Sequence, residues 1–444
     1  MLSFLRIKRR VNVGLRLTGA ALLLTTAVGL PQAEPKPAKA ANLSWSDVRP
    51  PLTDEADTNG ADGYTPLPTF GAVPHAIVVA PNGDVFTAGS TGSAWHVFRS
   101  TTGGKSWRVA ATPNVPGSST IRQIVVSPDY PSDGWVGFVY SDETAADGVP
   151  SVTDNGFCWA PSFPLGVGAT FGTTNCLDFV DGGVFANINL RTVAVSADFN
   201  WGDSSGELAV GGNQEAGTSS VAIAQTSALK STPAASDFIL TTDPDGDVSD
   251  VTGHLAYNNN EEPIALARLW VNLNATGDGP AGAGTYGQLL TAGVWEAATA
   301  STQISTNLAD YGQVGFDDEY SSGSAYFAAV SLTGAPAGGV YRFSGSTWSI
   351  KTSGSVDCNT DMSSLGVAGD GASVKIVASL PGSNAVCRTI NEGNSWTDRV
   401  TDGDDDVCNA CNVIPTGAIT FVASHRSNPS VVYYTTSAAL GGVF

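Results

Sequence analysis

One phrase recurs along the chain and constrains its fold more than any other feature. An apolar run is followed by a turn rich in Ser, Pro, Asp, Asn and Gly, and then by a second apolar run. Four of the copies carry Val, Ile or Ala on both faces, which is typical of strands buried between neighbouring sheets. We therefore predict a two-stranded hairpin for each copy. Seven copies begin at His75, Arg122, Arg191, Gly253, Gln313, Leu365 and Ala418.

A second phrase follows several hairpins and ends in tryptophan. It reads RSTTGGKSW from Arg99 and RTINEGNSW from Arg388, with shorter forms that end at Trp159 and Trp348. Each unit then contains a hairpin, a third strand, a turn with Gly and Trp, and a fourth strand. Four antiparallel strands with a period of about 50 residues are typical of a propeller blade. We predict an all-β, seven-bladed β-propeller of four-stranded antiparallel blades, with the last blade incomplete.

The chain is predicted to have three parts. Residues 1–40 read as a signal peptide, with a basic start, an apolar run over 17–30 and the small-x-small site Ala38-Lys39-Ala40. Residues 41–70 form an N-terminal segment that can supply a closing strand. The propeller covers 71–444, with blades that start near 73, 121, 190, 251, 312, 363 and 417.

The apolar run at the N-terminus bears on where the protein is located. It is shorter than the about 20 residues that a membrane-spanning helix needs. We expect a mature chain without a transmembrane segment, either secreted or at the cell surface. The alternative is that the segment stays attached as an N-terminal anchor.

The tryptophan phrase resembles the Asp-box, also called the bacterial neuraminidase repeat, S-x-D-x-G-x-T-W. The hairpins with Ser-Pro-Asp-Tyr resemble propellers related to the photosystem II assembly factor and those of sortilin and xyloglucanase type. The resemblance covers nearly all of residues 70–444 and implies a propeller, without implying one activity. The chain departs from the pattern, because Asp154 keeps the acidic residue while Thr102 and Asn391 replace it.

The residues of the box have properties that suit a structural turn. A short polar side chain accepts hydrogen bonds from nearby amides, a Gly permits a positive φ, and the Trp covers the apolar side of the hairpin. We expect these residues to fasten turns rather than to catalyse a reaction. They are Ser100, Thr102, Gly104, Trp107, Asp154, Gly156, Trp159, Gly345, Trp348, Asn391, Gly393 and Trp396.

The charge of the chain limits its partners. It has 21 Lys and Arg against 41 Asp and Glu, a net charge of -20, and seven of the basic residues lie in 1–40. A nucleic-acid partner requires a basic surface, so we expect none. We expect a protein or glycan partner instead.

Six cysteines indicate an oxidising compartment. We favour pairing between neighbours in sequence, although six cysteines allow 15 connectivities. The CxxC motif at the end is interpreted as a small structural disulfide, in preference to a redox motif or half of a zinc site. The pairs are Cys158–Cys176, Cys358–Cys387 and Cys408–Cys411.

Two arginines occupy matching positions in successive units. Arg122 and Arg191 each stand just before an innermost strand, so both side chains are placed to meet at one mouth of the central channel. Two guanidinium groups suit a carboxylate or another acidic group. The competing interpretation is that each Arg pairs with an acidic residue of its own blade.

One acidic loop suits a hard cation. Asp243, Asp245, Asp247 and Asp250 alternate around Gly246, and oxygen ligands of this kind bind Ca²⁺. The alternative is a solvated acidic loop. We expect a structural calcium ion and no other cofactor.

No catalytic constellation stands out. With so many acidic residues, the sequence does not identify the pair of carboxylates that glycoside hydrolysis requires. We expect an exported, non-enzymatic binding scaffold. The alternative is a glycoside hydrolase of sialidase or xyloglucanase type that uses carboxylates facing the channel.

Overall fold

The fold is known from a computed structural model, and the described residues all lie within the compact unit Ser44–Phe444. They are 76–90, 95–101, 103, 107–113, 115, 119–141, 155–160, 175–178, 188–214, 221–231, 233–240, 248–251, 256–257, 268–275, 284–291, 294–295, 303–307, 309–317, 326–332, 338–344, 347–353, 355, 358–369, 373–383, 385–400, 419–425 and 432–436.

Four sheets have four antiparallel strands each, in sequence order. The first consists of β1 (Ile77–Val79), β2 (Val85–Ser90), β3 (Trp95–Ser100) and β4 (Arg108–Ala111). The second consists of β5 (Thr120–Val126), β6 (Val136–Ser141), β7 (Gly156–Ala160) and β8 (Asn175–Asp178). The third consists of β19 (Ala309–Phe316), β20 (Tyr326–Leu332), β21 (Gly339–Ser344) and β22 (Thr347–Ile350). The fourth consists of β23 (Ser364–Ala368), β24 (Lys375–Ser379), β25 (Val386–Thr389) and β26 (Thr397–Val400).

The middle of the chain forms a ten-stranded sheet instead of two separate blades. The reason is β13, which pairs with β10 on one side and with β15 on the other. The strands are β9 (Ile188–Val195), β10 (Glu207–Gln214), β11 (Val221–Gln225), β12 (Ile239–Leu240), β13 (Val248–Val251), β14 (Ala256–Tyr257), β15 (Arg268–Ala275), β16 (Gly284–Thr291), β17 (Val294–Trp295) and β18 (Gln303–Ser305). The expectation of separate four-stranded blades is therefore wrong at this place.

The remaining elements are few. The last sheet has two strands among the described residues, β27 (Ile419–Ser424) and β28 (Val432–Thr436). Within the described residues, three short helices lie in connections: α1 (Tyr130–Asp133), α2 (Thr226–Ser231) and the 3-10 helix η1 (Ala235–Asp237).

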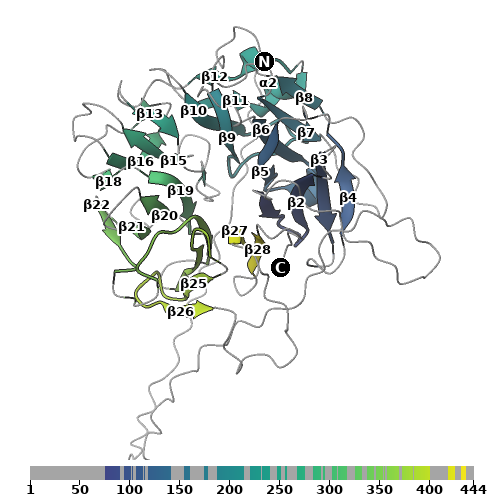
Figure 1. Ribbon diagram of the computed structural model, residues 1–444. Coiled ribbons are helices and arrows are strands. Elements are labelled where there is room, and N and C mark those ends of the chain that lie inside the picture. Colours follow the sequence, from purple (N-terminus) through teal and green to yellow (C-terminus); the bar gives the residue numbers. More distant parts are fainter. Residues whose placement is uncertain are drawn as a thin grey trace, which may run out of the picture. The chain divides into compact units, whose positions relative to one another are not determined.

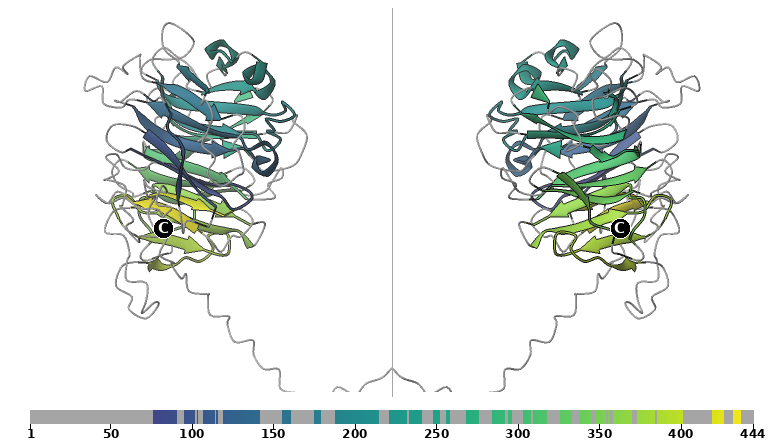
Figure 2. Two further views of the ribbon diagram at one scale, coloured as in Figure 1. Left: turned by 90° about the vertical axis from the view of Figure 1, so that its right-hand side faces the viewer. Right: turned by 90° about the vertical axis from the view of Figure 1, so that its left-hand side faces the viewer.

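All seven predicted hairpins are present as antiparallel strand pairs. We call their first strands, β1, β5, β9, β14, β19, β23 and β27, the inner strands. Each contacts the inner strand of the next hairpin, and β27 contacts β1 (Figure 1). Figure 2 shows the sheets one beside the next.

Apolar side chains from neighbouring sheets fill the spaces between them. Phe86 and Val97 of the first sheet pack with Phe138 of the second in one buried cluster. The first and last sheets share another cluster, in which Phe421 and Tyr433 lie with residues of β1 and β3. These contacts explain why the hairpin runs are apolar on both faces.

One box phrase does not lie where its pattern predicts. Asp154 is outside the described residues, while Gly156 and Trp159 lie inside β7, the third strand of its sheet. Gly156 stands opposite Tyr140, and a Cβ there would meet the Tyr140 hydroxyl oxygen. Close packing in a strand, rather than a turn with positive φ, therefore explains this glycine.

Candidate functional site

Hydrogen bonds between inner strands fix their relative level. The Gln123 side chain on β5 accepts hydrogen bonds from the Thr192 hydroxyl (2.7 Å) and the Val193 amide (2.8 Å) on β9. The same arrangement recurs where Gln313 on β19 accepts from the Ser364 hydroxyl and the Leu365 amide of β23, both at 2.8 Å.

Ser364 continues the series, because its hydroxyl accepts a hydrogen bond from the Val422 amide of β27 at 2.8 Å. Equivalent residues of successive hairpins are thus bonded side by side. The inner strands therefore begin on one side of the described structure, and their hairpin turns lie on the other. We call the first side the entry face and the second the turn face.

Arg122 and Arg191 directly precede the bonded residues Gln123 and Thr192. They consequently stand at the same level on β5 and β9, two inner strands in contact with each other. Each is also the extra residue of a β-bulge: pairing passes over Arg122 between Ile121 and Gln123, and over Arg191 in β9. A bulge redirects a side chain relative to the ladder. The structure therefore brings both predicted arginines to the entry face.

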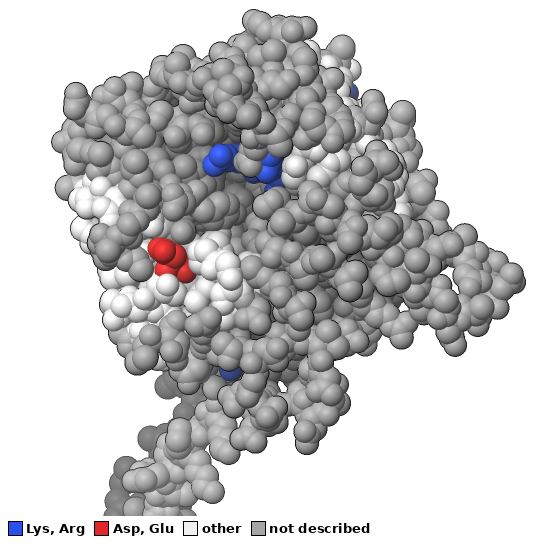
Figure 3. All heavy atoms as spheres, in the orientation of Figure 1, with Lys and Arg blue, Asp and Glu red and all other residues white. Residues whose placement is uncertain are grey.

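The arginines combine fixed contacts with exposure. The Arg122 Nε donates to the Ser141 hydroxyl at 3.0 Å, and one terminal nitrogen lies 3.4 Å from the Ser141 carbonyl oxygen. Both arginines are half-buried. Figure 3 shows basic side chains at the border of a recess, in the part of the view where Figure 1 places β9.

An acidic residue occupies another part of the entry face. Asp361 lies in the connection between β22 and β23, and its Oδ1 accepts hydrogen bonds from the Leu332 and Gly338 amides at 3.0 and 2.5 Å. Leu332 stands opposite Ala309, the first residue of inner strand β19. These contacts place the Asp361 carboxylate at the entry ends of β19 and β20. Sequence reasoning missed this residue, because no motif surrounds it.

Three further acids lie at the turn face. Asp129 and Asp198 stand in hairpin turns, and Asp317 directly follows β19. Asp129 accepts from the Asn200 side-chain amide at 2.6 Å. A strand rises about 3.3 Å per residue, so the four-residue run from Gln123 to Val126 separates these acids from the arginines. The arginines and the turn-face acids do not form one site.

A buried ion pair is also found at the turn face. The Arg99 Nε donates to the Asp84 carboxylate at 2.9 Å, and both side chains are 8% exposed. The Arg99 guanidinium lies 5.9 Å from the ring centre of Tyr130, which comes from the next hairpin. Burial raises the pKa of Tyr130 well above its usual range. This cluster joins two sheets and serves packing.

A second tyrosine links the third and fourth hairpins. The Tyr257 hydroxyl of β14 donates to the Glu207 carboxylate at 3.0 Å, and the Gln225 side chain donates to its other oxygen at 3.0 Å. Burial, followed by the negative charges of Glu207 and Asp198, raises the pKa of Tyr257 well above its usual range. A neutral tyrosine therefore links the third and fourth hairpins within the ten-stranded sheet.

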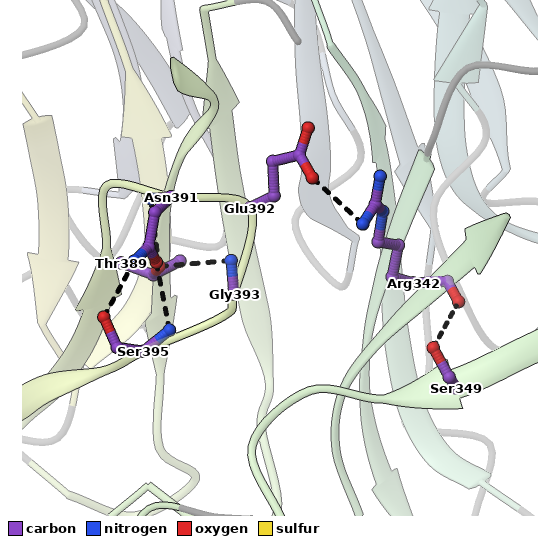
Figure 4. Close-up of polar contacts among 7 residues, drawn as sticks. All are labelled: Arg342, Ser349, Thr389, Asn391, Glu392, Gly393 and Ser395. Carbon is purple, nitrogen blue, oxygen red and sulfur yellow. Dashed lines mark hydrogen bonds and ion pairs between the residues drawn. The ribbon is translucent and has the colours of Figure 1, made fainter. Parts of the chain in front are cut away.

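The last box phrase forms a hydrogen-bonded turn (Figure 4). The Thr389 hydroxyl accepts from the Asn391 and Gly393 amides at 3.3 and 3.1 Å, and the Asn391 side-chain oxygen accepts from the Ser395 amide at 3.0 Å. Gly393 has a φ of 80° and Glu392 one of 58°. Polar acceptors and a glycine thus occupy the positions that the turn requires.

This turn also contacts the preceding sheet. The Trp396 indole N–H donates to the Lys351 carbonyl oxygen at 3.0 Å. Glu392 forms an ion pair with Arg342 of β21 at 2.9 Å, drawn in Figure 4. A Cβ at Gly393 would lie 2.9 Å from the Lys351 Cβ. The turn therefore joins two sheets in addition to closing its own hairpin.

The other box residues are described in part. Trp107 follows the turn after Ser100 and is buried with residues of the first and last sheets. Trp348 lies in β22 and packs against Phe343 at 5.4 Å. Thr102, Gly104 and Gly345 lie outside the described residues.

Two of the three predicted disulfides are present. Cys158 pairs with Cys176, and Cys358 pairs with Cys387. Cys408 and Cys411 lie outside the described residues.

The predicted calcium site is mostly outside the described residues. This holds for Asp243, Asp245 and Asp247, whereas Asp250 belongs to strand β13 and pairs in register with Asn213 and Asn274. Within the described part of the chain, no group of three or more His, Cys, Asp or Glu is placed to hold a metal ion. The calcium site stays a prediction.

Comparison with known proteins relates this chain to propellers by fold. No family model matches the chain, and no curated protein matches it. An ancestral GH74 enzyme is similar in structure, with a TM-score of 0.52 and 13% identity over 85% of this chain and 46% of the enzyme. An ulvan lyase of polysaccharide lyase family PL25, bound to -[GlcA(1-4)Rha3S]-, has a TM-score of 0.50 and 9% identity over 85% of this chain and 94% of the lyase.

This chain therefore corresponds to less than half the length of the GH74 enzyme. At these identities the likeness shows the fold alone, which is a β-propeller. Neither α-helix in the described part of the chain has the length and hydropathy needed to span a bilayer.

Proposed function

We propose that this chain is an exported β-propeller that binds an acidic glycan at its entry face and acts as a non-enzymatic scaffold. One observation carries the proposal: Arg122 and Arg191 stand at one level on adjacent inner strands at the entry face. Guanidinium groups form paired, charge-assisted hydrogen bonds with carboxylate and sulfate groups. A glycan with such groups is the ligand that the site fits best.

The spacing of the two arginines is fixed by the ladder beneath them. The bonds from Thr192 and Val193 to Gln123 join β5 to β9, and Ser141 holds the Arg122 guanidinium. A site whose groups are held in place loses less conformational entropy when a ligand binds. Such preorganisation is compatible with ligand binding at this place.

The rest of the chain limits how anions can bind. Its net charge is -20, so its long-range field repels acidic polymers. Binding of an acidic glycan would therefore depend on local contacts. Loss of one arginine would have a large effect, which makes the proposal easy to test.

We further propose seven blades of the Asp-box type, of which the third and fourth are joined through β13. Seven hairpins, and the contact of β27 with β1 after six contacts between successive inner strands, support this number. The turn from Thr389 to Trp396 supports the assignment to the Asp-box type. Export is supported by the disulfides Cys158–Cys176 and Cys358–Cys387, because disulfides persist in oxidising compartments.

The alternative function is glycan cleavage by a hydrolase of sialidase or xyloglucanase type. The similarity to the GH74 enzyme and the PL25 lyase fits this alternative as well as it fits a scaffold. Hydrolysis needs two carboxylates about 5 to 9.5 Å apart across the sugar. Asp361 is one carboxylate at the entry face, and the turn-face acids are too distant to be its partner.

A glycan array with acidic and neutral members tests the proposal, followed by incubation of each bound glycan and analysis of its products. We expect binding of carboxylated or sulfated glycans, loss of binding in Arg122→Ala and Arg191→Ala, and no products. Binding of neutral glycans alone would contradict the acidic site. Products that disappear in Asp361→Asn would favour the hydrolase.

A further inference from the structure

The residues at the entry ends of the inner strands, which we call the rim, differ in charge and size from one strand to the next. We infer that the entry face selects an oligosaccharide that carries an acidic group at one end and hydrogen-bond donors further along, rather than a single acidic group. This inference rests on the proposed function. It assigns Asp361 and Ser363, on the side away from β5 and β9, as specificity-determining residues.

The repeat allows equivalent rim positions to be compared. The residue before the bonded one is Arg122 in β5 and Arg191 in β9, but it is the buried Gly312 in β19 and Ser363 before β23. Two adjacent positions are thus cationic, and two others are small and uncharged.

Ser363 repeats the contact of Arg122 with a smaller group. The Arg122 guanidinium bonds to Ser141 at the end of β6, whereas the Ser363 hydroxyl lies 3.1 Å from the Ser379 hydroxyl at the end of β24. Ser379 is buried, and Ser363 is half-buried. A hydroxyl therefore occupies the place that a guanidinium takes in the second sheet.

Asp361 adds a negative charge two residues away. Its Oδ1 accepts from the Leu332 and Gly338 amides, while its Oδ2 has no hydrogen-bond partner among the described residues. The segment is held by the disulfide from Cys358 to Cys387 and by the Ser363 amide, which donates to the Ser379 carbonyl at 2.9 Å. The carboxylate is thus fixed with one oxygen left to accept a donor.

In Figure 3 an acidic side chain lies across the recess from the basic ones, in the part of the view where Figure 1 places β20. A carboxylate repels the acidic group that the arginines attract and accepts hydrogen bonds from hydroxyl groups. A ligand that satisfies both sides must be long enough to cross the recess and must have a defined direction.

Titration calorimetry with the full chain and two probes tests this inference. The probes are free glucuronic acid and a linear trisaccharide with one uronic acid end and neutral sugars beyond it. Asp361→Asn keeps an oxygen for the two amides, and Ser363→Ala leaves the backbone contacts intact. We expect each variant to weaken trisaccharide binding about tenfold, because each removes a hydrogen bond between the protein and the neutral end of the ligand. Glucuronic acid binding should stay within about twofold.

The outcomes separate this inference from the proposed function. Arg122→Ala could weaken the binding of both probes while Asp361→Asn and Ser363→Ala change neither. That result would refute the role of Asp361 and Ser363 in selecting the ligand and would leave the proposed binding of acidic groups by the arginines intact. If Asp361→Asn weakens the binding of both probes equally, the Asp361 carboxylate does not recognise the neutral end of the trisaccharide, and the inference also fails. If the unmodified chain binds no acidic probe, the proposed function fails first.

Discussion

Gln123 and Thr192 connect two inner strands through a hydrogen bond of 2.7 Å from the threonine hydroxyl to the glutamine side-chain oxygen. That oxygen also accepts from the Val193 amide. One glutamine therefore sets the level at which two hairpins meet, and Gln313 does the same for β19 and β23. The positions of Arg122 and Arg191 at the entry face depend on this contact.

Replacing Gln123 with Leu should destabilise the protein by about 1–3 kcal/mol, because an amide and a hydroxyl lose their acceptor in a partly buried place. Gln225→Leu is the matched control, since Gln225 is exposed and bonds to a side chain at the turn face. Denaturant unfolding followed by tryptophan fluorescence measures both. An equal loss of stability in the two variants would show that the hydrogen bonds of Gln123 between the inner strands contribute no more to stability than the exposed bond of Gln225.

Gly393 tests the contact of the last box turn with the preceding sheet. Gly393→Ala should cost more stability than Gly382→Ala. Both glycines have positive φ, 80° and 66°, so both substitutions add about 1–2 kcal/mol of backbone strain. Only at Gly393 would the new methyl group also press on the side chain of Lys351.

Thermal and denaturant unfolding of the two variants give the comparison directly. The Gly382 position is open, with no atom within 4 Å of the added Cβ. If both variants lose the same stability, the turn does not press on its neighbouring sheet.

Buried tyrosines predict a loss of stability at alkaline pH. Burial and the nearby charge of Glu207 raise the pKa of Tyr257 in the folded chain, while in the unfolded chain it stays near its ordinary value of about 10. Above that pH the unfolded state releases a proton that the folded state keeps. The free energy of unfolding should therefore be unaffected below about pH 10 and should fall as the pH rises further.

Absorbance of tyrosinate at 295 nm, recorded with circular dichroism during an alkaline titration, measures this effect. Ionisation of the buried tyrosines should coincide with unfolding. In Tyr257→Phe the alkaline fall in stability should be smaller. Complete ionisation of all tyrosines in a folded protein would refute the prediction.

Calcium binding by the acidic loop is the fourth prediction. We expect a chelator to lower the melting temperature, because a ligand present at about 100 times its Kd stabilises the folded state by about 2.7 kcal/mol. Asp243→Asn combined with Asp245→Asn should remove the difference between samples with calcium and with chelator. A melting temperature that does not change with chelator would rule out the site.

The repeats made much of the fold predictable. Short-range patterns identified the seven hairpins, because each is a local pairing of two apolar runs around a polar turn. The two disulfides in the described residues followed from their short separations, 18 and 29 residues. Local information was sufficient wherever partners are close in sequence.

The sequence was a poor guide where structure depends on distant partners. The short strand β13 joins β10 to β15, and nothing in VSDV indicates this double pairing. The phrase that ends at Trp159 has the spacing of a box, yet Gly156 lies in strand β7, and it is a glycine there because Tyr140 of β6 fills the space beside it.

The candidate site was predictable in part for the same reason. Arg122 and Arg191 were found because they occupy equivalent positions in successive repeats. Equivalent positions in a repeat indicate which residues lie at the same height along adjacent inner strands. Asp361 lies in no motif that the sequence pattern singles out. Its place depends on amides about 23 and 29 residues away, which no local pattern records.

The most direct test of the acidic site is the affinity of one acidic glycan for four forms of the chain: unmodified, Arg122→Ala, Arg191→Ala and Lys375→Ala. Lys375 lies at the turn end of β24, so its loss removes one positive charge away from the entry face. We predict that each arginine variant weakens binding about tenfold or more, and that Lys375→Ala stays within about twofold. Equal weakening in all three variants, or none in either arginine variant, would contradict the account.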